Sequence, residues 1–365
     1  MLFSSITFLY LFLPIVLGLY YIVPNKFKNS ILLMASLFFY FYGEPVYIIL
    51  MIVSIVSGYL HGLWIDKARE SKYAKLPMIS SLVVSIGLLV YFKYFDFIIL
   101  NINKVFSSDI FLVNLALPIG ISFYTFQIMS YTIDLYRGQA KVQKNVLDFA
   151  TYVSLFPQLI AGPIVRYTTV EKELAERSHT IEGGAYGIHR FIIGLSKKVL
   201  LANTLGELGT IFSNLNEETV LFYWMKALAY SLQIYFDFSA YSDMAIGLGR
   251  MLGFRFLENF NYPYISKSIT EFWRRWHISL GSWFRDYLYI PMGGNRVSKG
   301  KWLRNILVVW FLTGFWHGAQ WNFIVWGLYF AFLLIIEKHL LKKLLDRMPG
   351  IVSHIYVSFF IIISF

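Results

Sequence analysis

The chain has 365 residues, of which 57% are hydrophobic and 15% are charged. A soluble domain is about 45–50% apolar and about 25% charged, so the surplus apolar residues are expected to face lipid. This composition argues against a secreted disulfide-rich module, a disordered chain and a nucleic-acid-binding protein. The chain has no cysteine, which excludes disulfides, thiolate metal sites and a cysteine nucleophile.

Apolar runs follow one another along the chain, and several are long enough to cross a membrane as a helix of roughly 20 residues. The first runs from Met1 to Val23 and is followed by Lys26 and Lys28. The others lie near residues 30–64, 76–92, 111–136, 146–165, 185–212, 219–249, 303–337 and 351–365. The last run stops at Phe365 without a polar flank, so we expect the sequence to be truncated at its C-terminus.

Glycine and proline interrupt three of these runs. Gly43-Glu44-Pro45 divides the run 30–64 into two arms, and residues 117–120 (LPIG) interrupt the run 111–136. Phe156-Pro157 and Ala161-Gly162-Pro163 break the run 146–165. Broken backbone at membrane depth is tolerated only where protein or water satisfies the freed amides, so these breaks predict an internal cavity.

The formal net charge is +11, from 32 Lys and Arg against 21 Asp and Glu. With the N-terminus placed outside, all of these basic residues lie on the cytoplasmic side except Lys93, Lys104 and Lys226. Cytoplasmic loops of membrane proteins carry an excess of Lys and Arg, so the charge is interpreted as a topology signal. Its spread over many loops argues against nucleic-acid binding.

A candidate catalytic segment spans residues 262–296. Ser268 and Glu271 form a capping box, which predicts a helix that begins there. Its apolar face continues through Leu280, which predicts one amphipathic helix at the cytoplasmic interface. That face consists of Ile269, Phe272, Trp273, Trp276 and Leu280, extended by Trp283 and Tyr287, while Arg274 and Arg275 point away.

His277 falls at the edge of this apolar face. It is a candidate functional residue, and the alternative is an ordinary histidine that satisfies a hydrogen bond. The stretch that follows, residues 291–295 (PMGGN), is expected to be a turn whose free amides meet an anionic group.

His317 is a candidate general base. It lies within the apolar run 303–337, and it is flanked by Gly314 and Gly318 at a spacing that permits close approach of a second helix. We expect His317 to be buried, and burial favours the neutral imidazole, which accepts a proton. Nearby polar groups include Asn322. The alternative is a packing motif whose histidine is satisfied by a neighbour.

Carboxylates within residues 231–249 form a third candidate cluster. Asp237 shares one helical stripe with Gln233 and Tyr241, and Asp243 shares another with Ser239. Buried carboxylates in a membrane bind a cation, relay protons or cap a broken helix, and a structural role is at least as well supported as a catalytic one.

The chemistry that these residues favour is acyl transfer from a thioester to a hydroxyl. Phosphate-binding loops and nucleophile elbows are absent from the sequence. Neither His277 nor His317 has a second ligand at zinc-site spacing, so no metal and no bound cofactor are expected. A thioester is already activated, so the reaction needs only a base for the hydroxyl proton and donors for the oxyanion.

The chain resembles membrane-bound O-acyltransferases, in the branch of alginate and peptidoglycan O-acetyltransferase membrane subunits. The matching stretches are MLFSSITFLYLFLP at 1–14, FYGEP at 41–45, LPIGISFYTFQIMSYTIDLYRG at 117–138, FPQLIAGPIVRY at 156–167, YFDFSAYSDMAIGLGRMLGF at 235–254, FWRRWHISLGSWFRDYLYIPMGGNR at 272–296 and TGFWHGAQWNFIVWGLY at 313–329. The resemblance implies an all-α polytopic protein with a ring of transmembrane and re-entrant helices around a central funnel. It implies a single domain over 1–365, with 262–296 as an interfacial or re-entrant catalytic segment.

The same resemblance implies a reaction and a set of site residues. His317 is expected to be catalytic and His277 functionally important. The substrate channel is expected to include Trp273, Arg274, Arg275, Trp276, Asn322 and Asp237. Cytoplasmic acetyl-CoA would supply the acetyl group, and an extracytoplasmic esterase-like partner would pass it to a polysaccharide. The protein would lie in the bacterial cytoplasmic membrane, surrounded by lipid.

Three other functions stay open on the sequence. A related branch transfers D-alanine from a carrier protein to teichoic acid. A lipid O-acyltransferase would share His317 and take its acceptor from the membrane. A transporter or flippase would show two similar halves, and no internal repeat is visible.

Overall fold

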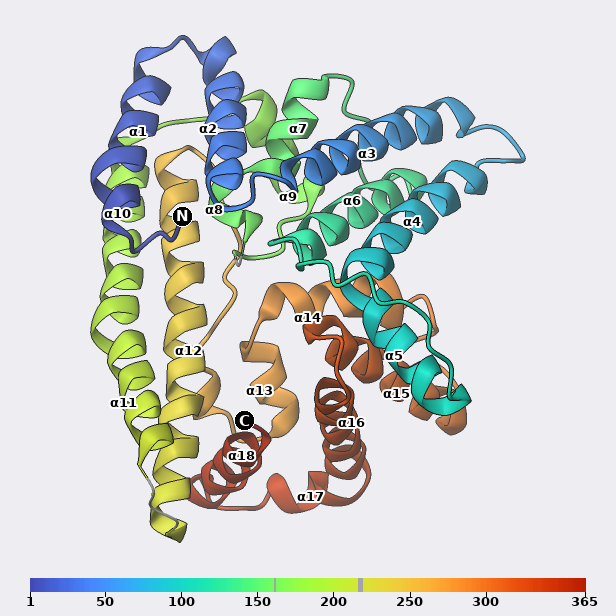
Figure 1. Ribbon diagram of the computed structural model, residues 1–365, viewed down its shortest axis with the longest axis vertical. Coiled ribbons are helices and arrows are strands. Elements are labelled where there is room, and N and C mark those ends of the chain that lie inside the picture. Colours follow the sequence, from blue (N-terminus) through green and yellow to red (C-terminus); the bar gives the residue numbers. More distant parts are fainter. Residues whose placement is uncertain (161, 216–218) are drawn as a thin grey trace. The chain divides into compact units, whose positions relative to one another are not determined.

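The computed structural model describes residues 1–160, 162–215 and 219–365 (Figure 1). Within these residues every regular element is a helix, which confirms the expected all-α class. The chain divides into two compact units. The first consists of Met1–Gly184, Gly249–Phe256 and Gly318–Gln320, and the second consists of Ala185–Leu248, Leu257–His317 and Trp321–Phe365. The single domain over 1–365 stays a prediction.

The first unit carries nine α-helices among its described residues. They are α1 (Leu13–Ile22), α2 (Lys28–Gly43), α3 (Ile48–Ala68), α4 (Lys75–Leu89), α5 (Phe95–Phe106), α6 (Ile121–Tyr136), α7 (Val146–Ser154), α8 (Phe156–Leu159) and α9 (Tyr167–Ala175). The predicted breaks at 43–45 and 117–120 fall where helices end and begin, as expected. The helix α7 ends at Ser154, and Phe156-Pro157 open the short helix α8. Ala161, part of the remaining predicted break, lies outside the described residues.

Small residues set the packing of this unit. Gly120 has a φ of +76°, and a Cβ there would lie 2.8 Å from the carbonyl oxygen of Leu159. On α3, a Cβ at Gly58 would lie 2.8 Å from the Ile128 side chain of α6. Contacts this short exclude a side chain, so α3 and α6 approach closely because glycine stands at the crossing.

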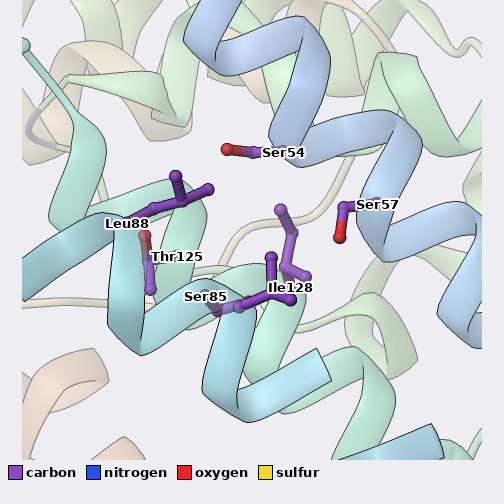
Figure 2. Close-up of a pocket in the computed structure, with 7 residues that line it drawn as sticks. Ser54, Ser57, Ser85, Leu88, Thr125 and Ile128 are labelled. Carbon is purple, nitrogen blue, oxygen red and sulfur yellow. The ribbon is translucent and has the colours of Figure 1, made fainter. Parts of the chain in front are cut away.

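A small pocket lies between α3, α4 and α6 in this unit (Figure 2). Hydroxyl groups line much of it, although it sits among apolar helices. Its lining residues are Ser54, Ser57, Val84, Ser85, Leu88, Thr125 and Ile128.

The second unit carries the C-terminal helices and most of the central ones. They are α10 (Ile181–Ser196), α11 (Asn203–Asn214), α12 (Val220–Met251), α13 (Ile269–Arg275), α14 (Ile278–Phe284), α15 (Lys299–His317), α16 (Trp321–Ile336), α17 (Lys342–Leu345) and α18 (Gly350–Ser364). A π-helical turn, Lys197–Ala202, joins α10 to α11. The helices α10 and α12 run side by side, and a Cβ at Gly194 would lie 2.7 Å from the Ala240 carbonyl oxygen.

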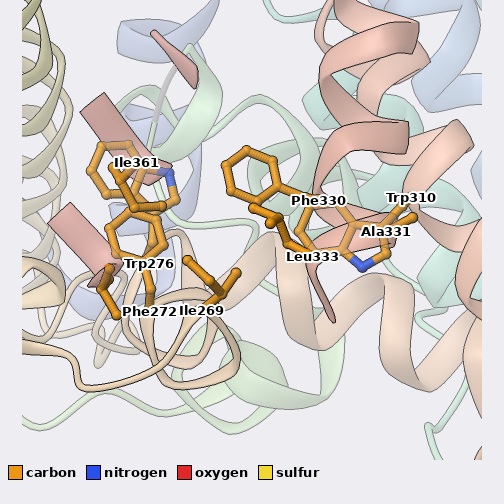
Figure 3. Packing of buried hydrophobic residues seen from close by; sticks show 9 residues of the cluster. Ile269, Phe272, Trp276, Trp310, Phe330, Ala331, Leu333 and Ile361 are labelled. Carbon is orange, nitrogen blue, oxygen red and sulfur yellow. The ribbon is translucent and has the colours of Figure 1, made fainter. Parts of the chain in front are cut away.

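The apolar core of the second unit joins α13 to the helices that follow it in the chain (Figure 3). It consists of Ile269, Phe272, Trp276, Trp310, Phe330, Ala331, Leu333, Val357 and Ile361. Aromatic rings dominate it, and rings combine large buried area with defined edge-to-face geometry. The core therefore holds α13 in one orientation against α15, α16 and α18.

Three helical segments of the described chain are long and apolar enough to cross a membrane. They are Ile48–Ala68, Lys75–Phe106 and Trp321–Leu345, with 21, 32 and 25 residues. The second contains α4 and α5, joined through a π-helical turn at Val90–Tyr94. The segments Phe8–Ile22 and Gly350–Ser364 are apolar and shorter.

Candidate active site

The segment 262–296 is not one continuous amphipathic helix, contrary to the sequence prediction. The helix α13 ends at Arg275, and α14 begins at Ile278. Between them His277 has a φ of +45°, in the left-handed region that residues other than glycine rarely adopt. Such a residue cannot continue a right-handed helix, so the apolar pattern through Leu280 is divided between two short helices.

Asn259 explains why the backbone breaks at this point. Its side-chain oxygen accepts hydrogen bonds from the Ser279 N–H at 3.1 Å and the Ser279 hydroxyl at 2.8 Å. Its backbone oxygen accepts from the Ile278 N–H at 2.9 Å. Asn259 is fully buried and donates to the Ser242 hydroxyl of α12 at 3.1 Å. The first amides of α14 are thus satisfied by a loop residue, and His277 is held in the turn.

The start of α13 is fixed by two side chains. Ser268 accepts a hydrogen bond from the Glu271 N–H at 3.0 Å, which confirms the predicted N-cap. In a capping box the Glu271 carboxylate would accept a hydrogen bond from the Ser268 N–H. Here it accepts from the Lys267 N–H, one residue earlier, at 2.9 Å. The buried carboxylate of Glu337 accepts from the N–H of Ile269 at 2.7 Å and that of Thr270 at 2.8 Å. A carboxylate at a helix N-terminus is stabilised by the helix dipole.

His277 is buried in an aromatic environment. Only 2% of its surface is exposed, and neither ring nitrogen has a hydrogen-bond partner among the described residues. Phe238 meets the imidazole edge-on at a centroid distance of 4.7 Å, and Trp316 lies at 6.0 Å. Burial without a counter-charge disfavours the imidazolium, so these surroundings favour a neutral ring. Two unsatisfied nitrogens in such a place are costly, which is typical of a functional site.

His317 is exposed, so its predicted burial was wrong. It is the last residue of α15, and the chain turns away from the helix axis immediately after it. Its ring lies 5.1 Å from that of Trp316 and 5.0 Å from that of Trp326. A residue at a helix end has no following helical turn to pack beside it. Apolar neighbours in sequence are therefore not enough to bury His317.

The predicted close helix approach at Gly314 is confirmed, but Gly318 takes no part in it as a helical residue. A Cβ at Gly314 would lie 2.2 Å from the Phe323 carbonyl oxygen of α16, and Gly327 stands directly opposite. The helix ends at His317, so Gly318 falls outside α15. This glycine pair brings α15 and α16 into backbone contact and fixes the position of His317 at the end of the hairpin.

Trp273 contacts Trp326, which is a ring neighbour of His317. Its ring lies 5.6 Å from that of Trp326 and 4.9 Å from that of Trp310. Its indole nitrogen is buried and has no hydrogen-bond partner in the described part of the chain. Trp276 differs, because it stacks on Phe272 at 5.5 Å within the apolar core. Trp273 thus packs against both the apolar core and the neighbour of His317, while Trp276 is a member of the core.

The remaining residues predicted for the channel are exposed or form ion pairs. Arg274 and Asn322 are exposed. Arg275 pairs with Glu271 at 2.8 Å along α13. Asp237 pairs with Lys198 at 2.6 Å.

The second carboxylate of α12, Asp243, is buried and paired with two cations. Arg190 lies 2.7 Å from one oxygen, and Lys197 lies 2.6 Å from the other. Removal of one partner from such a pair leaves an uncompensated buried charge. These contacts support the structural interpretation of Asp243, which ties α12 to α10.

Residues 291–295 form the expected turn, with positive φ at Gly293 and Gly294. The expectation of free amides was wrong for three of its residues. The N–H groups of Met292, Gly293 and Gly294 donate to the backbone oxygens of Leu288, Ile290 and Tyr289. These amides close the end of the preceding helical turn and are not available to an anion.

No group of three or more His, Asp or Glu side chains is placed to hold a metal ion in the ranges that the structure describes. The site geometry is that of two histidines, one buried and one exposed, in contact with the same tryptophan.

A profile of MBOAT, the membrane-bound O-acyltransferase family, matches residues 135–346. The chain therefore belongs to this family, as its motifs indicated, and it is a multi-pass membrane protein. The match includes His277, His317, the hairpin of α15 and α16, and all of α12.

The chain is similar to proteins named as acetylases and as alanyltransferases. A probable alginate O-acetylase AlgI of Pseudomonas aeruginosa is 47% identical over 345 residues, which cover 93% of this chain and 66% of that protein. A peptidoglycan O-acetyltransferase of Helicobacter pylori is 36% identical, over 99% of this chain and 75% of that protein. A teichoic acid D-alanyltransferase of Bacillus subtilis is 32% identical, over 60% of this chain and 59% of that protein. The chain thus spans less than two thirds of the length of the alginate O-acetylase of P. aeruginosa.

Two residues that organise the site were missed by sequence reasoning, namely Asn259 and Glu337. Asn259 lies in a loop without a motif, 20 residues before the Ser279 that it contacts. Glu337 lies at the end of an apolar run, where a carboxylate is ordinarily a solvated flank. Its position 68 residues after Ile269 gives no local signal of a cap.

Proposed function

We propose that this protein is a membrane O-acetyltransferase that moves an acetyl group from cytoplasmic acetyl-CoA across the membrane for O-acetylation of an extracytoplasmic polysaccharide. The observation that carries the proposal is the pair of histidines in contact with Trp316, in a family of O-acyltransferases. The acetylase names of two relatives support acetate as the acyl group.

The proposed chemistry places the proton transfer on His317. A hydroxyl oxygen of the acceptor attacks the thioester carbonyl carbon while the neutral imidazole takes the hydroxyl proton. The C–O bond forms, the tetrahedral oxyanion collapses and the C–S bond breaks. The CoA thiolate takes the proton back and leaves as the thiol, so no external reactant is required. General-base assistance of this kind contributes about 10²–10⁴-fold to a rate.

His277 and Trp273 are proposed to stabilise charge in this reaction. His277 is buried and neutral, so its N–H is a donor without a competing partner. The Trp273 indole N–H is a second unpaired donor, and an indole only donates. Donors aimed at the developing oxyanion in a site without water are worth far more than in solution. We also propose that the substrate route is lined by Arg274, Arg275, Asn322 and Asp237. Trp276 would pack beside this route.

Sidedness and partners complete the proposal. The distribution of basic residues supports an orientation in the bacterial cytoplasmic membrane with the N-terminus outside. An esterase-like partner on the outer side would accept the acetyl group and pass it to the polysaccharide. Alginate, peptidoglycan and other polysaccharides fit this scheme equally, because the partner would choose the acceptor.

The absence of cysteine makes a direct test possible. A thiol reagent added to the purified full chain and acetyl-CoA detects only the CoA thiol that the reaction releases. We expect thiol release from wild-type protein without an ion gradient, and loss of it in His317→Ala. Absence of thiol release, even with an acceptor polysaccharide and the partner protein present, would contradict the proposal.

D-alanyl transfer from a carrier protein is the second candidate, supported by the teichoic acid D-alanyltransferase relatives. Their lower identity and shorter coverage favour the acetyl donor. A side-by-side assay with acetyl-CoA and a D-alanyl carrier protein separates the two, because each thioester releases a different thiol.

A further inference from the structure

A basic cluster in the first unit lies outside the proposed active site. Three groups surround the ring of Tyr20 on α1. The Lys28 ammonium lies 5.0 Å from the ring centroid, and the Arg177 guanidinium lies 5.7 Å from it. The Nε2 atom of His179 lies 2.9 Å from the Tyr20 hydroxyl. One side chain thus gathers three groups that carry or can acquire positive charge.

The charges in this cluster have no direct counter-charge. Lys28 is 8% exposed, and it forms no ion pair or hydrogen bond within the described residues. The Nη1 atom of Arg177 is buried and has no hydrogen-bond partner there. Asp148 and Glu173 are the acidic groups that act on Arg177, neither of them in an ion pair with it, and Asp148 accepts a hydrogen bond from the Asn29 amide at 2.6 Å. An unpaired buried charge is costly, so a cluster of this kind is typical of a site that an anion completes.

The cluster is built, because hydrogen bonds hold its members in place. Asn29 accepts from Arg177 Nη2 at 2.6 Å and donates to the Leu174 carbonyl oxygen at 2.9 Å. The Tyr20 hydroxyl donates to the Leu252 carbonyl oxygen at 2.6 Å, so its oxygen accepts from His179 Nε2–H. In this tautomer Nδ1 is an acceptor, so His179 can donate to a phosphate oxygen only as the imidazolium, in which both ring nitrogens carry a proton.

Burial and the positive charges of the cluster lower the pKa values of Lys28 and His179. Burial lowers the pKa of Lys28, and the Arg177 charge lowers it further. Burial also lowers the pKa of His179, with added repulsion from Lys28 and Arg177. Lys28 is also the first residue of α2, a 16-residue helix whose first turn has no acidic residue. The N-terminus of a helix favours an anion in the same place.

We propose that Lys28, Arg177 and His179 bind a phosphate group. Phosphate is the anion that fits best, because it presents several oxygens to a fork of guanidinium donors and to a point charge. Two sources share this chemistry. One is the headgroup of an anionic phospholipid, and the other is a phosphate of CoA, which rests on the proposed acetyl-CoA donor.

The test is a binding measurement on the purified full chain in detergent. Two probes are added separately, namely CoA and phosphatidylglycerol, with phosphatidylcholine as the lipid control. A ligand that binds only the folded state raises the melting temperature. We expect one of the two probes to raise that of the wild type. If neither does, the site is refuted without any variant.

Charge-matched variants then assign the binding to the cluster. We expect Lys28→Gln and Arg177→Gln each to weaken the binding of the effective probe about tenfold, the factor that corresponds to loss of one charged hydrogen bond. The controls Lys26→Gln, two residues before Lys28, and Arg255→Gln, three residues after Leu252, remove the same charge from exposed positions and should bind like wild type. Lys28→Arg and Arg177→Lys keep the charge and provide folded comparisons.

The outcomes also separate this site from the proposed function. Equal affinity in all four glutamine variants would overturn the phosphate site, even if CoA binds elsewhere and acetyl transfer continues. Phospholipid binding that depends on Lys28 and Arg177 would stand even if the protein transferred no acetyl group.

Discussion

The imidazole of His277 lies 6.0 Å from the indole of Trp316, and that indole lies 5.1 Å from the ring of His317. A histidine at a break between two short helices is thereby joined to a histidine at the end of a long one. The buried ring faces the indole from one side, and the exposed ring follows it in sequence. Both imidazoles thus lie against the same indole.

The first prediction concerns His317. His317→Ala should fold, because the side chain is exposed at a helix end. Its rate of CoA thiol release should fall by about 10²–10⁴-fold if the imidazole is the general base. The control His189→Ala removes another exposed histidine, on α10, and should keep the wild-type rate. A normal rate in His317→Ala would remove this residue from the mechanism.

The second prediction separates the ring of His277 from its backbone. Asparagine tolerates the left-handed region, so His277→Asn should keep the turn at φ +45° and lose the imidazole. We expect a melting temperature near that of wild type and a loss of activity of about 10²–10³-fold, as for an oxyanion donor. A lower melting temperature with normal turnover would instead indicate that the ring only packs.

The third prediction tests Asn259 as a positioning residue. Asn259→Ala leaves the Ser279 N–H and the Ser242 hydroxyl without their buried partner, so it should cost about 1–3 kcal/mol of stability. We also expect kcat to fall more than the affinity for acetyl-CoA, since the His277 turn is loosened and the donor site is not. Asn261→Ala, at an exposed position two residues later, is the control. Equal losses in both variants would deny Asn259 a specific role.

Much of this architecture follows from local sequence. Gly43-Glu44-Pro45 and Gly120 stand where the helices end or begin, and Ser268 caps α13, because turn and cap residues act within a few positions of the chain. The break at His277 has no such local cause. It depends on Asn259, a tertiary partner, and an apolar face at helical spacing gives no sign of it.

Burial of the two histidines was also beyond local sequence. His317 has apolar neighbours on both sides and yet is exposed, because α15 ends at that residue. His277 follows two arginines and a tryptophan and yet is buried, because Phe238 and Trp316 cover it from other helices. The spacing of apolar residues predicts which face of a helix is buried. His277 and His317 both lie at helix ends, where this spacing gives no information about burial.

The fourth prediction concerns the hairpin of α15 and α16. Gly314→Ala places a Cβ 2.2 Å from the Phe323 carbonyl oxygen, so the helices must separate. We expect a strong fall in melting temperature and loss of activity, because the end of α15 carries His317. Gly300→Ala lies in the same helix with no atom near its added Cβ, and it should be neutral or stabilising by about 0.5–1 kcal/mol. Comparable melting temperatures for the two variants would contradict the close packing.

The last prediction is a pH dependence of stability at His179. Burial, with repulsion from Lys28 and Arg177, lowers its pKa below the usual 6.5 in the folded protein. Between the folded pKa and 6.5 the unfolded chain holds more protons, so acid favours unfolding in that window. The melting temperature of the wild type should therefore fall as the pH drops below 6.5, and this fall should be smaller in His179→Gln. Since His179 is only partly buried, the difference should be modest. His189→Gln controls for the loss of one histidine, and identical pH profiles for wild type and His179→Gln would show that the basic cluster does not act on this ring.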